Sequence, residues 1–121
     1  MDITLIINGL DLHEKLSTYK MTQEVTYRKI VTTLDDVEHP YPGKIRPIIT
    51  FSLLPLTDDE SAELYDALKT LVFQASFTNQ YSGMDETKRV RLVTNIESTF
   101  ALTSVDGKRR YKGSEIQLRG L

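Results

Sequence analysis

The sequence contains no cysteine and no tryptophan, and only four of its 121 residues are proline. Without cysteine, disulfides, thiolate metal sites and a cysteine nucleophile are all excluded. No apolar run approaches the roughly 20 residues of a membrane-spanning helix. The first residues, MDITLIINGLD, lack the basic segment of a signal peptide. A single domain is expected over residues 1–121, because a chain of this length buries roughly two thirds of its unfolded surface in one core.

Motifs of enzyme active sites are missing as well. The sequence has no G-x-S-x-G elbow, no phosphate-binding glycine loop and no dinucleotide fingerprint. His13 and His39 lie far apart and show no metal-ligand spacing. The acids of residues 35–38 lack the spacing and the glycine of a calcium loop. We therefore expect no catalytic residue, no cofactor and no metal ion, and hence a protein that is not an enzyme.

Alternating apolar and polar residues predict a mainly β fold. Residues 18–29 place Tyr19, Met21, Val25 and Tyr27 on one face of a strand. In the stretch KIRPIITFSLLPL one face carries Ile45, Ile49, Phe51 and Leu53. The other face is also partly apolar, which is typical of a strand that is covered on both sides. These patterns predict an antiparallel β-sandwich or partly open barrel.

The second half of the chain continues the strand pattern. Phe73, Ala75 and Phe77 alternate inward, and the even positions of residues 90–102 predict one long half-buried strand. Asp106-Gly107 is typical of a hairpin turn into a last strand. That last strand carries apolar residues on conflicting faces, so we expect a bulge at Gly113 to restore its register.

One helix is predicted, over about residues 57–71. Thr57 and Glu60 form a T-x-x-E capping box, and the neighbouring acids favour a helix amino terminus. Leu64, Leu68 and Leu71 recur at helical spacing and are expected to face the sheet. Consecutive acids on a helix point in different directions, so we interpret residues 58–60 as capping rather than as a metal or acid–base cluster.

Two stretches are candidates for assembly contacts. Residues 32–44 contain two prolines, a glycine and three acids, which indicates a long loop or an extended arm; a plain surface loop and an arm that docks on a neighbour remain equal alternatives. Charge is also uneven: residues 1–87 carry net −7 and residues 88–121 net +5. For the basic runs a solvated face ranks first, an assembly contact second and nucleic acid last. The candidate contacts are His39, Pro40, Tyr41, Pro42, Lys88, Arg89, Arg109, Arg110 and Lys112.

Three stretches carry a family resemblance: IINGLDLHEKLSTYKMTQEVTY, ITFSLLPLTDDESAELYDALKTL and YKGSEIQLRGL. In their order and content they resemble small tail-region structural proteins of phages and prophages of Gram-positive bacteria. The resemblance implies the fold of tail-tube, distal-tail and head–tail joining proteins, in which one helix lies against a β-sandwich or partly closed barrel. It carries over no catalytic residue.

The resemblance implies a non-enzymatic virion structural or assembly protein. Such a protein would form a ring or stacked oligomer, dock on other phage tail proteins, and reside in the host cytoplasm during assembly and then in the virion tail. Cyclic symmetry requires a heterologous interface between copies. The alternative is a small binding or regulatory module, such as an inhibitor or adaptor with a β-sandwich fold. No direct contact with nucleic acid or membrane is expected.

Overall fold

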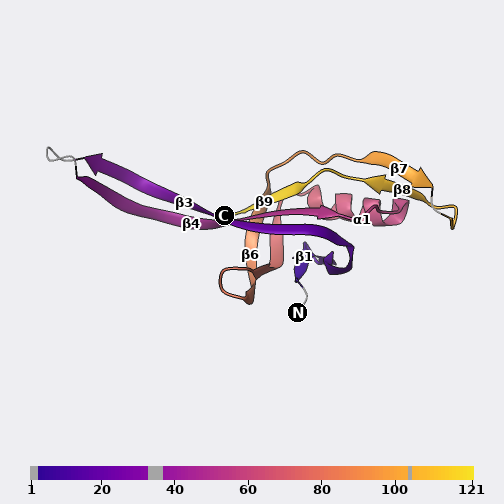
Figure 1. Cartoon of the computed structure of the whole chain (residues 1–121), viewed down its shortest axis with the longest axis horizontal. Coiled ribbons are helices and arrows are strands. Elements are labelled where there is room, and N and C mark those ends of the chain that lie inside the picture. Colours follow the sequence, from indigo (N-terminus) through magenta and orange to yellow (C-terminus); the bar gives the residue numbers. More distant parts are fainter. Residues whose placement is uncertain (1–2, 33–36, 104) are drawn as a thin grey trace.

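A computed structural model describes residues 3–32, 37–103 and 105–121 of the chain. Nine strands, one short 3-10 helix and one α-helix occur in this part (Figure 1). Their bounds are β1 Leu5–Ile7, β2 Leu10–Asp11, η1 His13–Lys15, β3 Leu16–Thr32, β4 Glu38–Leu53, α1 Asp58–Leu68, β5 Val72–Asn79, β6 Met84–Leu92, β7 Thr99–Thr103, β8 Arg109–Lys112 and β9 Ile116–Gly120.

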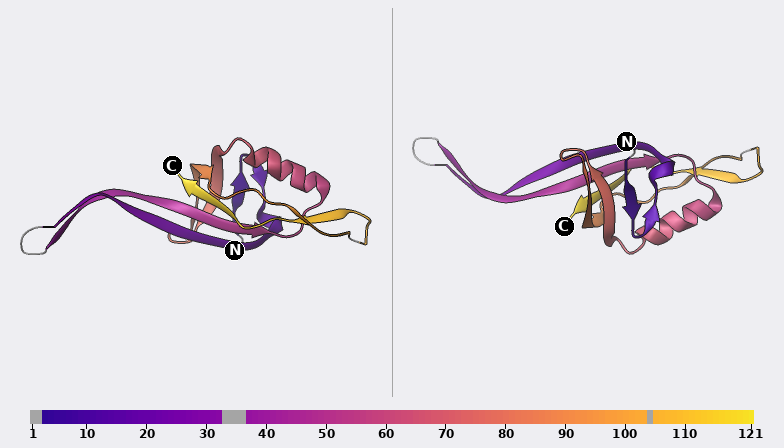
Figure 2. Two further views of the ribbon diagram at one scale, coloured as in Figure 1. Left: turned by 90° about the horizontal axis from the view of Figure 1, so that it is seen from above. Right: turned by 90° about the horizontal axis from the view of Figure 1, so that it is seen from below.

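Seven strands form one antiparallel sheet in the order β2-β1-β5-β6-β9-β4-β3, which curls into a half-barrel. β7 and β8 form a separate two-stranded sheet. Figure 2 shows α1 on one side of the body and the long strands β3 and β4 on the other. The prediction of a mainly β fold with a partly open barrel and one helix is therefore confirmed.

The core lies between α1 and the inward face of the half-barrel. Leu68 is fully buried and belongs to the same apolar cluster as the inward residues of six strands, β1, β3, β4, β5, β6 and β9. The predicted alternation of β5 is confirmed, since Phe73, Ala75 and Phe77 are all buried. The other large residues of the cluster are Leu5, Ile7, Leu12, Met21, Ile49, Phe51, Val90, Ile116 and Leu118.

The helix begins as predicted but ends earlier. The Thr57 hydroxyl accepts from the Glu60 N–H at 3.4 Å, and a Glu60 carboxylate oxygen accepts from the Thr57 N–H at 3.1 Å, which completes the capping box. Leu71 adopts a left-handed φ of 66°, and its carbonyl accepts a 2.8 Å hydrogen bond from the Leu92 N–H. This backbone tie turns the chain towards β5 and leaves Leu71 56% exposed, so its prediction as a core residue is wrong.

The segment over residues 32–44 is mostly paired strand rather than loop. Thr32 ends β3 and is paired with Glu38, the first residue of β4, so only residues 33–37 separate the two strands. Residues 33–36 lie outside the described residues. The ladder of β3 and β4 continues beyond the body of the sheet, and the hairpin projects from it as an arm (Figure 1). The prolines are accommodated because β4 pairs only with β3 along this part of its length.

Two strand predictions from the second half of the chain are wrong for a shared reason. The pattern over residues 90–102 is divided between β6 and β7, which belong to different sheets. The last strand is likewise divided, because Gly113 lies in a break between β8 and β9 rather than at a bulge. The conflict of faces disappears in consequence, since Tyr111 pairs with Leu56 while Ile116 enters the main core.

Replacement of Leu68 by aspartate is expected to destabilise the fold by about 3–5 kcal/mol, because it places an unpaired charge in the core. Leu71→Asp is the matched control, since Leu71 is exposed and aspartate tolerates a left-handed φ. Urea unfolding of both variants measures the difference. Equal stability losses would contradict the placement of Leu68 at the centre of the core.

Candidate assembly surfaces

The arm continues a core-facing strand surface into solvent. Met21 and Ile49 are directly paired across β3 and β4, and both are buried. Two pairs further along the same face, Val25 lies opposite Ile45, and these side chains are 54% and 62% exposed. The expectation that Val25 and Ile45 face the core is therefore wrong. Val25 and Ile45 lie on the part of this strand face that extends beyond the body of the protein.

Side chains from the turn after β5 cover the free edge of β3 at Met21, where the strand lies in the body. The Met21 N–H donates to the Gln80 side-chain oxygen at 3.2 Å, and the Tyr81 hydroxyl donates to the Met21 carbonyl at 3.3 Å. The Tyr19 hydroxyl donates to the Thr78 carbonyl at 2.6 Å, and burial, followed by the charge of Asp85, raises the pKa of Tyr19 to about 12. The turn between β5 and β6 thus marks where the body ends and the arm begins.

The candidate contacts of the arm all lie on β4. In the ladder they stand opposite four residues of β3. The pairs are His39 with Val31, Pro40 with Ile30, Tyr41 with Lys29, and Pro42 with Tyr27. The proline-rich stretch is therefore part of a two-stranded ribbon, whose register shifts on either side of Tyr27.

The two arginines of β8 are bound within the molecule. Arg109 donates from Nε and from a terminal nitrogen to one Asp58 oxygen, at 3.1 and 2.8 Å. Arg110 lies 3.6 Å from Glu60 and 3.6 Å from Asp106. The acidic start of α1 and the basic run of β8 therefore neutralise one another, although they lie far apart in the sequence. Lys112, at the end of the same strand, is exposed.

These contacts alter the acidity of both helix acids. A hydrogen bond with Tyr111, followed by one from Arg109, lowers the pKa of the Asp58 carboxyl. The pKa of Glu60 is lowered to about 2. The largest cause is Lys15, whose ammonium lies 3.0 Å from the Glu60 carboxylate, and the hydrogen bond from the Thr57 backbone comes next. Glu60 thus joins η1, α1 and β8 through a single carboxylate.

The two basic runs do not form one patch. Lys88 and Arg89 lie on β6 in the half-barrel, whereas Arg109, Arg110 and Lys112 lie on β8 in the small sheet. Lys88 is opposite the buried Ala75 and therefore belongs to the inward face, near Glu86 at 4.0 Å. Arg89 belongs to the outer face.

Sequence reasoning missed the neighbours of Arg89 on that outer face. Arg91 lies directly opposite Arg119 of β9, so two guanidinium groups share one side of adjacent strands. The Arg119 side chain binds Glu24 of β3. Arg46 of β4 lies directly opposite the same glutamate in the strand ladder. The alternation of β6 does place Arg89 and Arg91 on one face, but the pairing of β6 with β9 and of β9 with β4 cannot be read from any local pattern.

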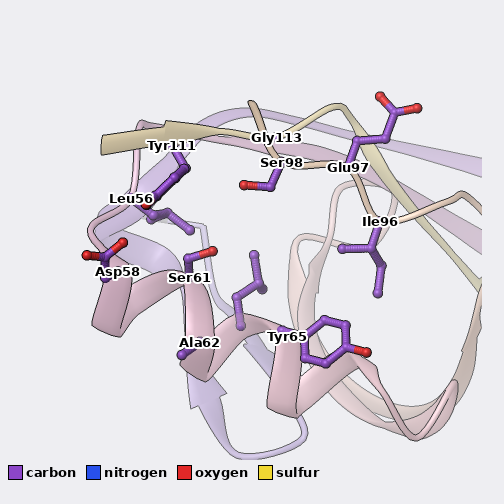
Figure 3. Close-up of a pocket in the computed structure, with 11 residues that line it drawn as sticks. Leu56, Asp58, Ser61, Ala62, Tyr65, Ile96, Glu97, Ser98, Tyr111 and Gly113 are labelled. Carbon is purple, nitrogen blue, oxygen red and sulfur yellow. The ribbon is translucent and has the colours of Figure 1, made fainter. Parts of the chain in front are cut away.

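A groove of about 410 Å³ lies between α1, the segment before β7 and the start of β8 (Figure 3). Its walls are mainly apolar and include Leu56, Leu64, Tyr65, Ile96 and Tyr111. The Tyr111 ring also meets the edge of Phe100, with ring centres 6.3 Å apart. Both Tyr65 and Phe100 are more than half exposed, so this end of the molecule presents a second apolar surface.

Among the described residues, no group of three or more histidine or acidic side chains is placed to hold a metal ion. No helix in the described part is long and apolar enough to cross a membrane. No protein-family model matches the chain, and no curated protein matches it.

The Glu60 contacts make stability depend on pH. Because the pKa of Glu60 falls from an ordinary 4.5 to about 2 in the folded protein, its stabilising effect is complete above pH 4.5 and is lost as pH falls towards 2. Glu60→Gln should cost about 1–2 kcal/mol at pH 7, after allowance for solvent screening, and almost nothing at pH 2. Urea unfolding from pH 7 to 2 tests this. Glu63→Gln is the control, and an equal effect there would contradict the assignment.

Proposed function

We propose that the protein is a non-enzymatic structural or assembly subunit of a phage or prophage tail, which self-associates and docks on neighbouring tail proteins. The observation that carries the proposal is the arm formed by β3 and β4. Its base exposes Val25 and Ile45 as a directly paired apolar couple on a face that is core elsewhere. Exposed apolar faces that continue from a core are typical of surfaces that a partner covers.

The physical cost of an isolated arm supports a partner. Beyond the body, β3 and β4 pair only with each other, and a lone two-stranded hairpin is at best marginally stable in water. Contact with a neighbouring copy would add packing on its apolar face. The arm and the groove beside α1 lie towards opposite ends of the molecule (Figure 1). If the arm of one copy contacts the groove end of the next, the copies join head to tail, which generates rings or stacks.

The assignment to a tail rests on the residue pattern. The three stretches that resemble tail-region proteins form the β1–β3 region, β4 with α1, and β8 with β9. A half-barrel with one capped helix is the arrangement that this resemblance led us to expect. In this proposal the subunit occupies the host cytoplasm during assembly and the tail region of the finished virion.

A small binding module is the second candidate function, and the groove beside α1 favours it. A cavity of about 410 Å³ with mainly apolar walls has the size of a site for a short peptide segment or a small molecule. Sizing by light scattering separates the two functions. A subunit that stays monomeric alone and with its tail partners, yet binds one protein in a fixed ratio through the groove, is a binding module.

Removal of the arm is expected to abolish assembly and leave the fold intact. The Met21 N–H and C=O both point away from β4, so Met21 and its partner on β4 are a non-hydrogen-bonded pair. Because the two kinds of pair alternate along an antiparallel ladder, Glu24 and Arg46 are a hydrogen-bonded pair. A two-residue Asn-Gly turn can join such a pair. We would replace residues 25–45 by this turn and measure assembly by light scattering and electron microscopy, with tail partners present. A folded, armless protein that assembles as wild type does would refute the arm's role.

A milder change tests the apolar couple alone. Val25→Thr with Ile45→Thr keeps the ribbon but removes apolar surface worth about 1–2 kcal/mol for each side chain if it is buried on association. Self-association should weaken more than tenfold, while the melting temperature of the monomer hardly changes. Leu54→Thr, at an exposed residue outside the arm, is the control and should leave association unchanged.

A further inference from the structure

We propose that copies of this protein stack with the acidic outer side of α1 on one copy against the arginine-rich outer face of the half-barrel on the next. This inference rests on the proposed self-association and names a second contact that drives it, separate from the arm. The arginine face consists of Arg89, Arg91, Arg119 and Arg46. The acidic stripe consists of Asp59, Glu63 and Asp66.

The arginine face holds surplus positive charge. Arg91 and Arg119 are directly opposite on adjacent strands, and Arg89 lies two residues along β6 on the same side. Like charges placed opposite one another destabilise a sheet. Glu24 binds Arg119, whereas neither Arg89 nor Arg91 has an ion-pair partner among the described residues. An arriving anionic surface would remove this repulsion.

Arg119 is not fully hydrogen-bonded within the subunit. Its Nε is buried and has no hydrogen-bond partner within the described part of the chain. A buried donor without a partner is costly, and most such groups in proteins are satisfied. That Nε is shielded from solvent, so a carboxylate of a second copy would bind the guanidinium of Arg91 and the terminal nitrogens of Arg119 instead.

The acidic stripe is the complementary surface. Asp59, Glu63 and Asp66 follow one another at i, i+4 and i+7, so they share the side of α1 that faces away from Leu64 and Leu68. All three are exposed. Lys69 pairs with Asp66 at 3.1 Å, and no partner of Asp59 or Glu63 is found in the described residues. The bases of β8 do not neutralise the stripe, because they bind Asp58 and Glu60 instead.

Layer order prevents the two surfaces from meeting within one molecule. Leu68 packs in the core that the inward strand residues also form, so the core separates the outer side of α1 from the outer face of the sheet. Two complementary surfaces on opposite sides of one subunit join copies head to tail, into a stack or, where the rotation between copies closes, a ring. Nucleic acid is the other anion to weigh, but the arginine face has no exposed aromatic among its described residues on which bases would stack.

Reciprocal charge reversal tests the contact. The helix variant carries Asp59→Lys and Glu63→Lys, so its helix surface becomes basic like its arginine face. The sheet variant carries Arg89→Glu and Arg91→Glu, so its sheet face becomes acidic like its acidic stripe. Each variant alone should lose self-association by about 100-fold at low salt, because like charges then face one another. An equimolar mixture should regain it, since every contact in an alternating stack again joins opposite charges.

Matched controls carry the same net charges away from both surfaces. Glu14→Lys with Glu115→Lys and Lys108→Glu with Lys112→Glu should each associate as wild type does. Sedimentation of all four proteins, alone and mixed, at 20 mM and 500 mM salt is the measurement; higher salt should weaken the rescued contact, because the screening length falls well below 10 Å.

The outcomes separate this inference from the proposed function. If the armless protein fails to assemble while the helix and sheet variants assemble as wild type does, the stacking contact is wrong and self-association stands. If no protein associates at any concentration, both are wrong. If the mixture gains no more than the mixed controls, or if the sheet variant loses only binding to a duplex DNA fragment, the acidic stripe is not the partner of the arginine face.

Discussion

Burial of the inward face of the half-barrel beneath α1 is the interaction on which the rest of the structure depends. Leu68 joins strands from both ends of the sheet into one apolar cluster. Each strand that contributes to this cluster must present its other face outward. The position of the helix therefore decides which charges are exposed, and it leaves the continuation of β3 and β4 as a ribbon that no other part of the described chain covers.

Electrostatic pairing complements this packing. The capping acids of α1 accept the cap hydrogen bond and also bind bases from η1 and β8, so one short segment neutralises charges from two other regions of the sequence. Among the described residues, Arg89 and Arg91 on the outer face of the sheet and Asp59 and Glu63 on the outer side of α1 remain without an ion-pair partner. The proposed repeating assembly would use these two charged surfaces together with the exposed Val25 and Ile45 at the base of the arm.

Local patterns predicted the elements whose environment is the same along their whole length. The capping box, the alternation of β5 and the Asp106-Gly107 hairpin are all set by residues close in sequence. Val25, Ile45 and Leu71 were assigned to the core because their periodicity matches that of their buried neighbours. Periodicity identifies a face of an element but not how far the body of the protein extends along it.

The sequence by itself determined the fold class, the single helix with its cap, and the absence of cysteine chemistry, since these depend on composition and on contacts within a few residues. Only the tertiary structure decided which strands meet. It divided one continuous pattern between β6 and β7, turned residues 38–44 into strand, and placed Arg91 opposite Arg119. Long-range pairing is chosen by the packing of the whole core, and no stretch of local sequence contains that information.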